Sequence, residues 1–552
     1  MPLNDNGFDY DWVVIGSGFG GSVAALRLAE RGYSVAVLEC GRRWATEDLP
    51  ETTWNLRKYF WLPGLGLRGI LRMNFFRNIS IVSGAGVGGG SLVYSQTLYR
   101  AGATFRERLN TAVGTAVDLD PYYEIAEFML GVVDTPRKTS RDAMIIATAE
   151  DLGISADRYR PTRIGVFFGS EPGVTVPDPY FGGEGPERAG CIECGRCMVG
   201  CRHNAKNTLD KNYLYLAERR GARVLPERLV TDIRPIGAPD GADGYEIRAR
   251  RPGAWIRKRR TVLRARGVVL AAGTLGTNRL LAACRRRGSL PALSGRLGRD
   301  VRTNAESMGA IMLRDRTADL TDGVALTGSL LPTDDLHFQW AQYGGGGDSM
   351  GALFLPLTGG ATRMPRPLQL LHAILVHPLD FLRSRNVSGW SRHSMIVAAM
   401  WNHDGVIELQ SARRWFGGVG LRARVDPANP LPTCIPPLND FIEHMAEKYD
   451  AVPQLWATES FGIPFTAHIL GGAILGTDPA NGVIDGNHRV FGYRNLLITD
   501  GSAVPYNPGV NPSLTIAALA ERAMSAVHAK DGTIRKTGIG YRPSPSPTGP
   551  LT

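Results

Sequence analysis

The chain has 552 residues, of which 43% are hydrophobic and 21% are charged. These shares are ordinary for a globular protein and exclude a disordered, collagen-like or coiled-coil chain. Its 67 glycines exceed the usual share of about 7% and gather in clusters, which favours backbone packed against a ligand. The formal net charge of +11 raises the question of a nucleic-acid partner, so the position of the basic residues matters.

No apolar run approaches the roughly 20 residues that a membrane span needs. The first ten residues lack the basic and apolar stretches of a signal peptide. We therefore expect a cytoplasmic protein whose contact with a membrane, if it makes one, is peripheral.

The N-terminal segment predicts a βαβ unit, with strands at 10–15 and 34–38 and a helix at 20–31. A G-x-G-x-x-G fingerprint occupies the first turn: Gly16, Ser17, Gly18, Gly20 and Gly21. Such glycines let a pyrophosphate approach the helix N-terminus, and Glu39, which ends the second strand, would accept hydrogen bonds from a ribose. This pattern predicts dinucleotide binding; the alternative is a glycine-rich turn of an ordinary α/β fold.

The segment 57–77 carries five basic and no acidic residues among several aromatic ones. This mixture suits a loop that rests on an anionic bilayer, and a lid packed on the active site is an equal alternative. A second apolar stretch, 368–382, predicts a helix too short to span a membrane. Either segment could line a large apolar pocket.

A second glycine cluster lies at 83–92 and has almost no side chains, so it needs a ligand or another backbone against it. Its residues predicted to contact the cofactor are Gly86, Gly88, Gly89, Gly90 and Ser91.

Four cysteines follow the spacing C-x2-C-x2-C-x3-C: Cys191, Cys194, Cys197 and Cys201. This is the ligand run of bacterial ferredoxins without the proline that follows the fourth cysteine. The spacing predicts a [4Fe–4S] or a [3Fe–4S] cluster, with zinc, disulfides or free thiols as alternatives. The basic residues just after the run could dock an acidic redox partner or be ordinary surface charge.

Residues 247–266 hold nine basic and no acidic residues. The segment alternates as strands do and contains a Pro-Gly turn signal, so we read it as the solvated face of a β-meander. We favour this reading over a patch for an anionic partner and expect no nucleic-acid binding.

Two later segments each predict a strand, a loop and a helix, at 268–281 and 495–527. Gly273 lies in the first loop. In the second, Asp500 and Gly501 end the strand at the carboxyl edge of the sheet, where ligands bind in open α/β folds. Asn511 is a good helix N-cap and Pro512 a good first helical residue. The positive end of this helix would stabilise a negative charge on a bound ligand.

Taken in order, these segments resemble the glucose-methanol-choline (GMC) family of flavoprotein oxidoreductases, and within it the bacterial cholesterol-oxidase-like branch. The resemblance rests on the N-terminal fingerprint, on 84–94, on 271–281, and on 468–472 followed by 499–522. Tyr94 stands where the family has an asparagine, which departs from the usual flavin site.

The resemblance implies an α/β fold in which a Rossmann-type FAD-binding domain carries an inserted β-sheet substrate-binding domain. The expected parts are the FAD-binding βαβ unit at 1–45, its continuation at 46–320, a mainly substrate-binding region at 321–465, a C-terminal FAD-binding part at 466–535 and a disordered tail at 536–552. The continuation would hold the glycine motif at 83–94, the cysteines at 191–201 and the meander at 223–281.

The resemblance further implies that FAD oxidises a secondary alcohol, expected to be a 3β-hydroxysteroid or sterol, by hydride transfer to flavin N5. His468 is the candidate base, and Asn511 is the second residue expected to be catalytic. The resemblance also implies a glutamate, which no local motif places; Glu306 is one choice. The acceptor would be dioxygen. The alternatives are a non-steroid alcohol dehydrogenase that passes electrons through an iron–sulfur cluster to a quinone or cytochrome, and a non-catalytic redox or lipid-binding protein.

Overall fold

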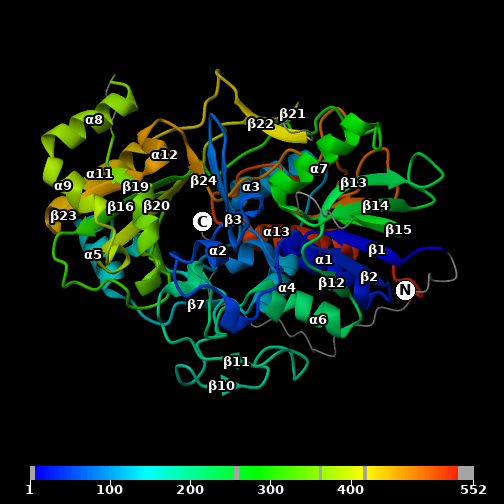
Figure 1. The fold of residues 1–552 in the computed structure, drawn as a ribbon, viewed down its shortest axis with the longest axis horizontal. Coiled ribbons are helices and arrows are strands. Elements are labelled where there is room, and N and C mark those ends of the chain that lie inside the picture. The colour runs from blue at the N-terminus through cyan, green and yellow to red at the C-terminus, as the bar shows by residue number, and fades with distance from the viewer. Residues whose placement is uncertain (1–6, 254–259, 360–363, 414–418, 533–552) are drawn as a thin grey trace.

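The computed structural model describes residues 7–253, 260–359, 364–413 and 419–532. Two seven-stranded sheets lie at opposite ends of the molecule (Figure 1). The first sheet has the order β12-β2-β1-β15-β14-β13, and β25 also pairs with β15. Its strands are β1 (Tyr10–Ile15), β2 (Val35–Leu38), β12 (Arg223–Leu225), β13 (Leu229–Pro235), β14 (Tyr245–Arg250), β15 (Arg260–Leu270) and β25 (Leu496–Ile498). The predicted disordered tail at 536–552 lies outside the described residues.

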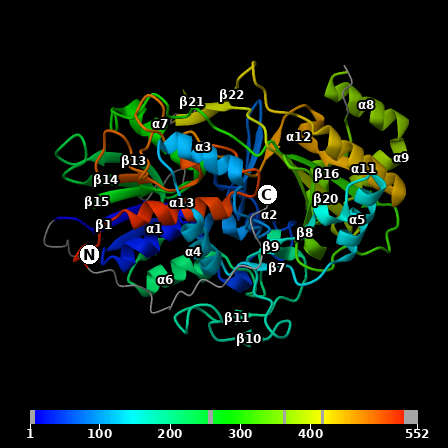
Figure 2. The same cartoon turned by 180° about the vertical axis from the view of Figure 1, so that it is seen from behind.

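The βαβ unit forms the parallel half of this sheet, where β1 pairs with β2 on one side and with β15 on the other. Both strands are fully buried because helices cover them. Helix α1 (Phe19–Glu30) packs against α13 (Ser513–Ser525) and α6 (Tyr213–Arg219) (Figure 2). The two ends of the chain therefore complete one domain, and Lys530 Nζ lies 2.7 Å from Asp11 Oδ2.

The basic segment lies in the antiparallel half, formed by β13, β14 and β15. Part of it, 254–259, lies outside the described residues. Several of its arginines are paired with carboxylates: Arg248 with Glu246 at 2.7 Å and Arg251 with Glu227 at 3.2 Å. These two positive charges of the segment are thus balanced locally.

The second sheet is antiparallel throughout, in the order β19-β23-β16-β20-β18-β17-β8. Its strands are β19 (Phe354–Pro356), β23 (Ala451–Trp456), β16 (Ser307–Leu313), β20 (Ser394–Trp401), β18 (Leu336–Ala341), β17 (Leu326–Thr333) and β8 (Tyr159–Pro161). Helix α11 (Pro436–Lys448) packs against α5 (Ser140–Asp151) and against this sheet, and their apolar side chains share one core. The sheet takes β8 and β16 from outside the range 321–465, because hydrogen bonding, not chain continuity, decides which strands pair.

A small sheet joins the two halves. Strand β6 (Ser80–Gly84) pairs antiparallel with β5 (Leu71–Phe75) and parallel with β24 (Phe465–Thr466). This pairing brings the second glycine cluster close to the segment that carries His468.

Within 57–77 the aromatic residues divide between core and surface. Tyr59 and Trp61 are buried in an apolar core, whereas Leu62, Leu65 and Phe75 are exposed. The segment therefore packs on the protein through its first aromatic residues and leaves only part of its apolar surface free.

The stretch 368–382, predicted to be a single helix, forms two: α8 (Arg366–Val376) and α9 (Pro378–Arg385). The prediction of one helix was wrong because proline disfavours helical backbone in the residue before it, and His377 precedes Pro378. Both helices lie at the outer edge of the second sheet (Figure 1). Within the described ranges, no helix combines the length and apolar character that crossing a membrane requires.

The remaining helices and strands connect these parts. They are α2 (Leu56–Tyr59), β3 (Trp61–Leu62), β4 (Leu67–Arg68), α3 (Ala103–Val113), α4 (Asp120–Leu130), β7 (Val133–Asp134), β9 (Arg163–Ile164), β10 (Thr175–Val176), β11 (Arg188–Ala189), α7 (Gly273–Arg287), α10 (Trp390–His393), β21 (Ile407–Arg413), β22 (Val419–Val425) and α12 (Ala457–Ser460).

Candidate active site

The predicted cofactor-binding glycines come together from distant parts of the chain. A Cβ atom on Gly16 would lie 2.1 Å from the carbonyl oxygen of Ala271, and one on Gly20 would lie 1.9 Å from that of Thr499. A Cβ on Gly89 would lie 2.7 Å from Gly18 Cα. Only glycine allows such close backbone approach, so the structure packs the fingerprint against the second cluster and both later loops.

Glu39 and Ser17 fasten the fingerprint to the second glycine cluster. The Glu39 carboxylate accepts hydrogen bonds from Ser17 N at 3.1 Å, from Ser17 Oγ at 2.8 Å and from Gly41 N at 2.7 Å. Ser17 Oγ also accepts one from Gly88 N at 3.2 Å. The predicted ribose contact of Glu39 stays a prediction, and an ionised carboxylate can accept about four hydrogen bonds in total.

The second cluster is braced by a serine. Ser91 Oγ donates to the carbonyl oxygen of Gly88 at 2.7 Å and accepts from Leu209 N at 3.1 Å. Gly86 and Gly88 have positive φ angles of 135° and 104°, a backbone region that side chains disfavour. The loop around Gly90 is therefore rigid although it is almost free of side chains.

The N-terminus of α1 fits the pyrophosphate of FAD. Its N-cap is Gly18, and no side chain caps the helix. A Cβ atom on Gly18 would meet nothing within 4 Å, so open space adjoins the first turn. Uncapped backbone N–H groups and the positive end of the helix dipole bind phosphate well. These residues could hold FAD.

Replacing Gly18 with alanine tests this site. We expect the Gly18→Ala protein to fold as stably as the parent but to bind FAD about tenfold more weakly or worse, because the new methyl group enters space that a pyrophosphate would use. Gly102 offers a matched control: it is also an extended N-cap, of α3, and a Cβ atom on it would meet nothing within 4 Å. Equal flavin content after purification of Gly18→Ala and Gly102→Ala would contradict the assignment.

The C-terminal loop brings a buried acid, Asp500, to the predicted cofactor site. Asp500 accepts a hydrogen bond from Ser502 N at 2.9 Å and one from Thr277 Oγ1, and it also interacts with the backbone N–H of Gly273. Burial raises the pKa of Asp500 above its ordinary value. Gly501 follows in a tight turn against Thr274. Helix α7 and the loop before α13 are thereby locked together.

The predicted helix cap at Asn511 was wrong. The N-cap of α13 is Pro512, and no side chain caps the helix. The Asn511 side chain points elsewhere: its Oδ1 accepts a hydrogen bond from Gln339 Nε2 at 2.9 Å. Asn511 is therefore free to take part in a site between the two sheets, and the uncapped helix end faces the same region.

His468 lies two residues beyond β24 and is partly buried, with 18% of its side chain exposed. Its Nδ1 lies 2.7 Å from Glu306 Oε1, and its Nε2 lies 3.4 Å from Asn511 Nδ2. An ionised carboxylate can only accept, so the contact with Glu306 favours the tautomer that carries its proton on Nδ1. The lone pair of Nε2 then faces Asn511, which is the state that a general base requires.

Glu306 positions the backbone of His468 as well as its ring. Its Oε2 accepts hydrogen bonds from Ala467 N at 3.0 Å and His468 N at 3.3 Å, and one from Thr466 Oγ1. The preceding residue, Ala305, has a φ angle of 45°, which is strained for a residue with a side chain. Strain of this kind is maintained by the surrounding contacts and is common at functional sites.

Sequence reasoning missed two amides in this site. Gln339 on β18 holds Asn511, and Asn304 Nδ2 lies 3.1 Å from His468 Nδ1 and donates to the carbonyl oxygen of Val510 at 2.9 Å. No motif marks either residue. The only local signal was the pair of polar residues Asn304 and Glu306 just before an apolar strand.

A second buried carboxyl group, Glu459 on α12, lies behind this site. Its Oε2 accepts a hydrogen bond from Met308 N at 3.0 Å, two residues after Glu306. Burial raises the pKa of Glu459 from 4.5 to about 7. The folded protein therefore binds this proton more tightly than the unfolded chain does.

The raised pKa of Glu459 predicts a pH-dependent stability. The stabilisation of the folded protein by this bound proton is complete below pH 4.5 and is lost as the pH rises through about 7. The Glu459→Gln protein cannot lose this proton, so its free energy of unfolding should gain up to about 3 kcal/mol on the parent between pH 5 and 8. Thermal unfolding midpoints across that range measure it. The exposed Glu447→Gln on α11 should show no such trend, and parallel curves for Glu459→Gln and the parent would contradict the prediction.

Two other histidines have structural roles. His488 is fully buried, its Nδ1 lies 2.7 Å from the carbonyl oxygen of Ile498, and burial lowers its pKa to about 4. His403 Nδ1 accepts a hydrogen bond from Gly405 N at 2.9 Å. Neither contacts His468 in the hydrogen bonds described.

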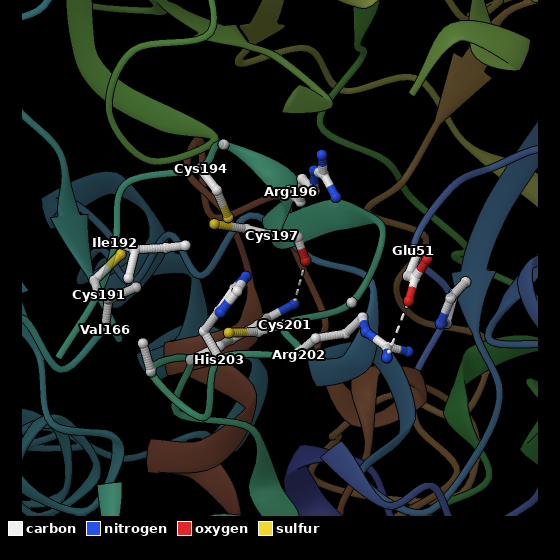
Figure 3. A pocket seen from close by; sticks show the side chains of 15 residues that line it. Glu51, Val166, Cys191, Ile192, Cys194, Arg196, Cys197, Cys201, Arg202 and His203 are labelled. Carbon is white, nitrogen blue, oxygen red and sulfur yellow. Dashed lines mark hydrogen bonds and ion pairs between the residues drawn. The ribbon is translucent and has the colours of Figure 1, made fainter. Parts of the chain in front are cut away.

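The four cysteines of the run line one pocket, together with basic residues that follow them (Figure 3). All seven cysteines of the chain are free thiols. Within the described residues, no group of three or more histidine, cysteine, aspartate or glutamate side chains is placed to hold a metal ion. The spacing thus predicted a shared location correctly, but the predicted metal site and the disulfide alternative find no support.

Burial raises the pKa of Cys197 to about 12 and also raises the pKa values of Cys191 and Cys194. Next to them, the buried Lys206 Nζ donates to the carbonyl oxygens of Tyr94 at 2.8 Å and Cys197 at 2.9 Å. This ammonium ties the cysteine loop to the second glycine cluster.

A Rossmann-type sheet with its glycine loops, and a His–Asn–Glu cluster beside a second, antiparallel sheet, form the arrangement expected of a flavoprotein oxidoreductase. Residues 186–284 and 443–520 match GMC oxidoreductase, and residues 14–51 match an NAD(P)-binding Rossmann-like domain. The chain belongs to the GMC oxidoreductase family, and it is an FAD-dependent enzyme that acts on CH–OH groups.

Two relatives match along almost the whole chain. It is 43% identical over 532 residues to a cholesterol oxidase of Acinetobacter baumannii, covering 95% of each protein. It is 46% identical over 545 residues to a cholesterol oxidase of Mycobacterium tuberculosis (strain ATCC 25618 / H37Rv), covering 96% of this chain and 93% of the relative. Pyridoxine 4-oxidase from Mesorbium loti shares the fold, with a TM-score of 0.60 at 15% identity over 93% of this chain and 98% of that one.

Proposed function

We propose that this protein oxidises the 3β-hydroxyl group of a sterol to the ketone, with FAD as the oxidant. The observation that carries the proposal is the pairing of His468 with Glu306 and Asn511 at the junction of the two sheets. The cholesterol oxidases that resemble the chain support the choice of substrate.

The first task of the site is to remove the hydroxyl proton, because an alcohol is a poor hydride donor until that proton leaves. His468 Nε2 takes the proton, and the resulting imidazolium is stabilised by the Glu306 carboxylate at Nδ1. Asn511 Nδ2 can donate to the substrate oxygen and so fix its position next to Nε2. Gln339 holds Asn511 in that orientation.

Bound FAD supplies the hydride acceptor, flavin N5. The residues that would hold it are those of the glycine loops at 16–21 and 86–91 and of the loop at 500–512. The uncapped N-terminus of α13 would stabilise the negative charge that reduction adds.

Anaerobic mixing of the purified holoenzyme with cholesterol in detergent micelles tests the reaction. We expect the flavin absorbance to bleach and one equivalent of the 3-ketone to form. A long-chain primary alcohol in the same micelles is the control for specificity. Absence of bleaching by any sterol, with bleaching by the primary alcohol, would favour the non-steroid dehydrogenase instead.

We also propose that dioxygen is the electron acceptor, since the relatives matched along the chain are oxidases. Oxygen uptake stoichiometric with ketone formation is the expected result. The alternative route, through an iron–sulfur cluster held by the four cysteines to a quinone, a cytochrome or an acceptor protein, predicts iron and acid-labile sulfide in protein purified without oxygen. Oxygen uptake and the content of iron and acid-labile sulfide should be measured on the same protein sample.

A further inference from the structure

Helices α8 and α9 expose a continuous apolar stripe. Six of its residues are between 52% and 70% exposed: Leu368, Leu371, Leu375, Val376, Leu379 and Leu382. Five of them recur every three or four positions, which places them on one side of each helix. Leu370 and Ser384, which are buried, anchor the pair to the protein from the other side.

This stripe is unlike the rest of the surface. Of the 18 large apolar side chains that are exposed in the described residues, seven lie between Met364 and Leu382. Single exposed apolar residues are normal, but a contiguous group marks a surface that contacts a protein or a membrane. Each helix has fewer than 12 residues, so the pair could lie in the plane of a bilayer interface but could not cross it.

The charges beside the stripe suit an anionic surface. From 364 to 385 the only acidic residue is Asp380, which is paired with Arg314 at 2.8 Å and with Arg383 at 3.0 Å. The same stretch contributes three arginines and two histidines. An amphipathic helix with basic residues beside its apolar face binds anionic lipid by burying the apolar face and by attracting the charged headgroups.

The stripe is also connected to the candidate active site. Helix α8 packs against α12, where Glu459 binds the backbone of β16 next to Glu306. Along the chain, α12 continues through Phe461, which is exposed, into β24 and His468. A membrane contact at α8 would therefore lie on the element that leads to the base.

We propose that the α8–α9 pair docks the protein on an anionic lipid bilayer, with the leucines inserted in the interface. This docking rests on the proposed function, because a sterol substrate resides in lipid. A second copy of this chain seated on the stripe is the competing occupant, and vesicle binding together with the oligomeric state separates the two.

Flotation with vesicles of phosphatidylcholine and phosphatidylglycerol at 3:1, without sterol, tests the docking of the holoenzyme. We expect the parent protein to float with these vesicles and to bind less at high salt or on pure phosphatidylcholine. Replacing Leu371 and Leu375 together with aspartate should weaken binding about 100-fold, roughly tenfold for each leucine. The matched control replaces Leu152 and Val174, exposed elsewhere, with aspartate and should bind like the parent.

Two further measurements decide the interpretation. Activity on cholesterol in detergent micelles should be equal for parent and variant. If the proposed sterol oxidation is wrong, this activity will be absent, whereas the flotation result will be unaffected. Sedimentation should show the parent as the same species as the variant. A parent protein that stays off the vesicles, or one that dimerises while the variant is monomeric, would overturn the docking proposal. The milder pair Leu379→Ser and Leu382→Ser should give the same direction of change.

Discussion

Replacing His468 with alanine should slow anaerobic flavin reduction by substrate by about 10²–10⁴-fold, the usual contribution of a positioned general base. The reason is local: in the tautomer that donates from Nδ1 to Glu306, Nε2 carries the lone pair that takes the proton. FAD content should be unchanged, since the contacts described for this ring are with Asn304, Glu306 and Asn511 and not with the glycine loops at 16–21 and 86–91. Stopped-flow bleaching of the flavin at saturating substrate measures the effect directly.

His444 provides the control for this substitution. It lies on α11, where its Nε2 is 3.1 Å from Asp151 Oδ2, and the contacts described for it include neither His468 nor Glu306. The His444→Ala protein should reduce its flavin at the parent rate. If His468→Ala also retained the parent rate, the base would have to be another group and the proposed proton transfer would be abandoned.

Exchanging Glu306 for glutamine should produce the second largest loss, about 10²–10⁴-fold in kcat, with KM changed little. The glutamine oxygen can still accept from the backbone of Ala467, so the loop should keep its shape. Its amide can present a donor to Nδ1, however, which favours the tautomer with the proton on Nε2. In a serine-protease triad the corresponding Asp→Asn change, which leaves the wrong tautomer, costs about 10⁴-fold.

The neighbouring carboxyl group separates this effect from a general loss of stability. Glu459→Gln removes a buried acid that binds Met308 N and is not bonded to the histidine ring in the contacts described, so it should leave kcat near the parent value. If the Glu306→Gln protein had a higher KM but the kcat of the parent, Glu306 would serve substrate binding and would not position the base.

The elements set by local sequence were predicted well. Strand β1 matches the expected 10–15, and α1 begins at Phe19, one residue before the predicted start, because an apolar run and a glycine turn define both. The sequence also contained what was needed to expect a break at Pro378, but the apolar pattern on both sides hid it. Periodicity describes which side chains face inward and carries little information on where a helix must stop.

The partners of His468 could not be predicted in the same way. Glu306 meets His468 across 162 positions and Gln339 meets Asn511 across 172, and no motif encodes either contact. The cysteine run shows a different limit of prediction from sequence. Its spacing fixes that four thiols lie in one loop, but whether they converge on a metal depends on side-chain directions that spacing does not determine.

The closure of the first domain by both chain ends has a consequence for biosynthesis. Arg27 in α1 bonds Glu521 in α13, 494 positions later, and β25 joins the sheet only after β15. A growing chain thus carries its fingerprint turn for nearly the whole of translation without the loop and helix that complete the cofactor site. Chains that stop early should fail to retain flavin, so the ribosome must deliver almost the entire polypeptide before the holoenzyme can form.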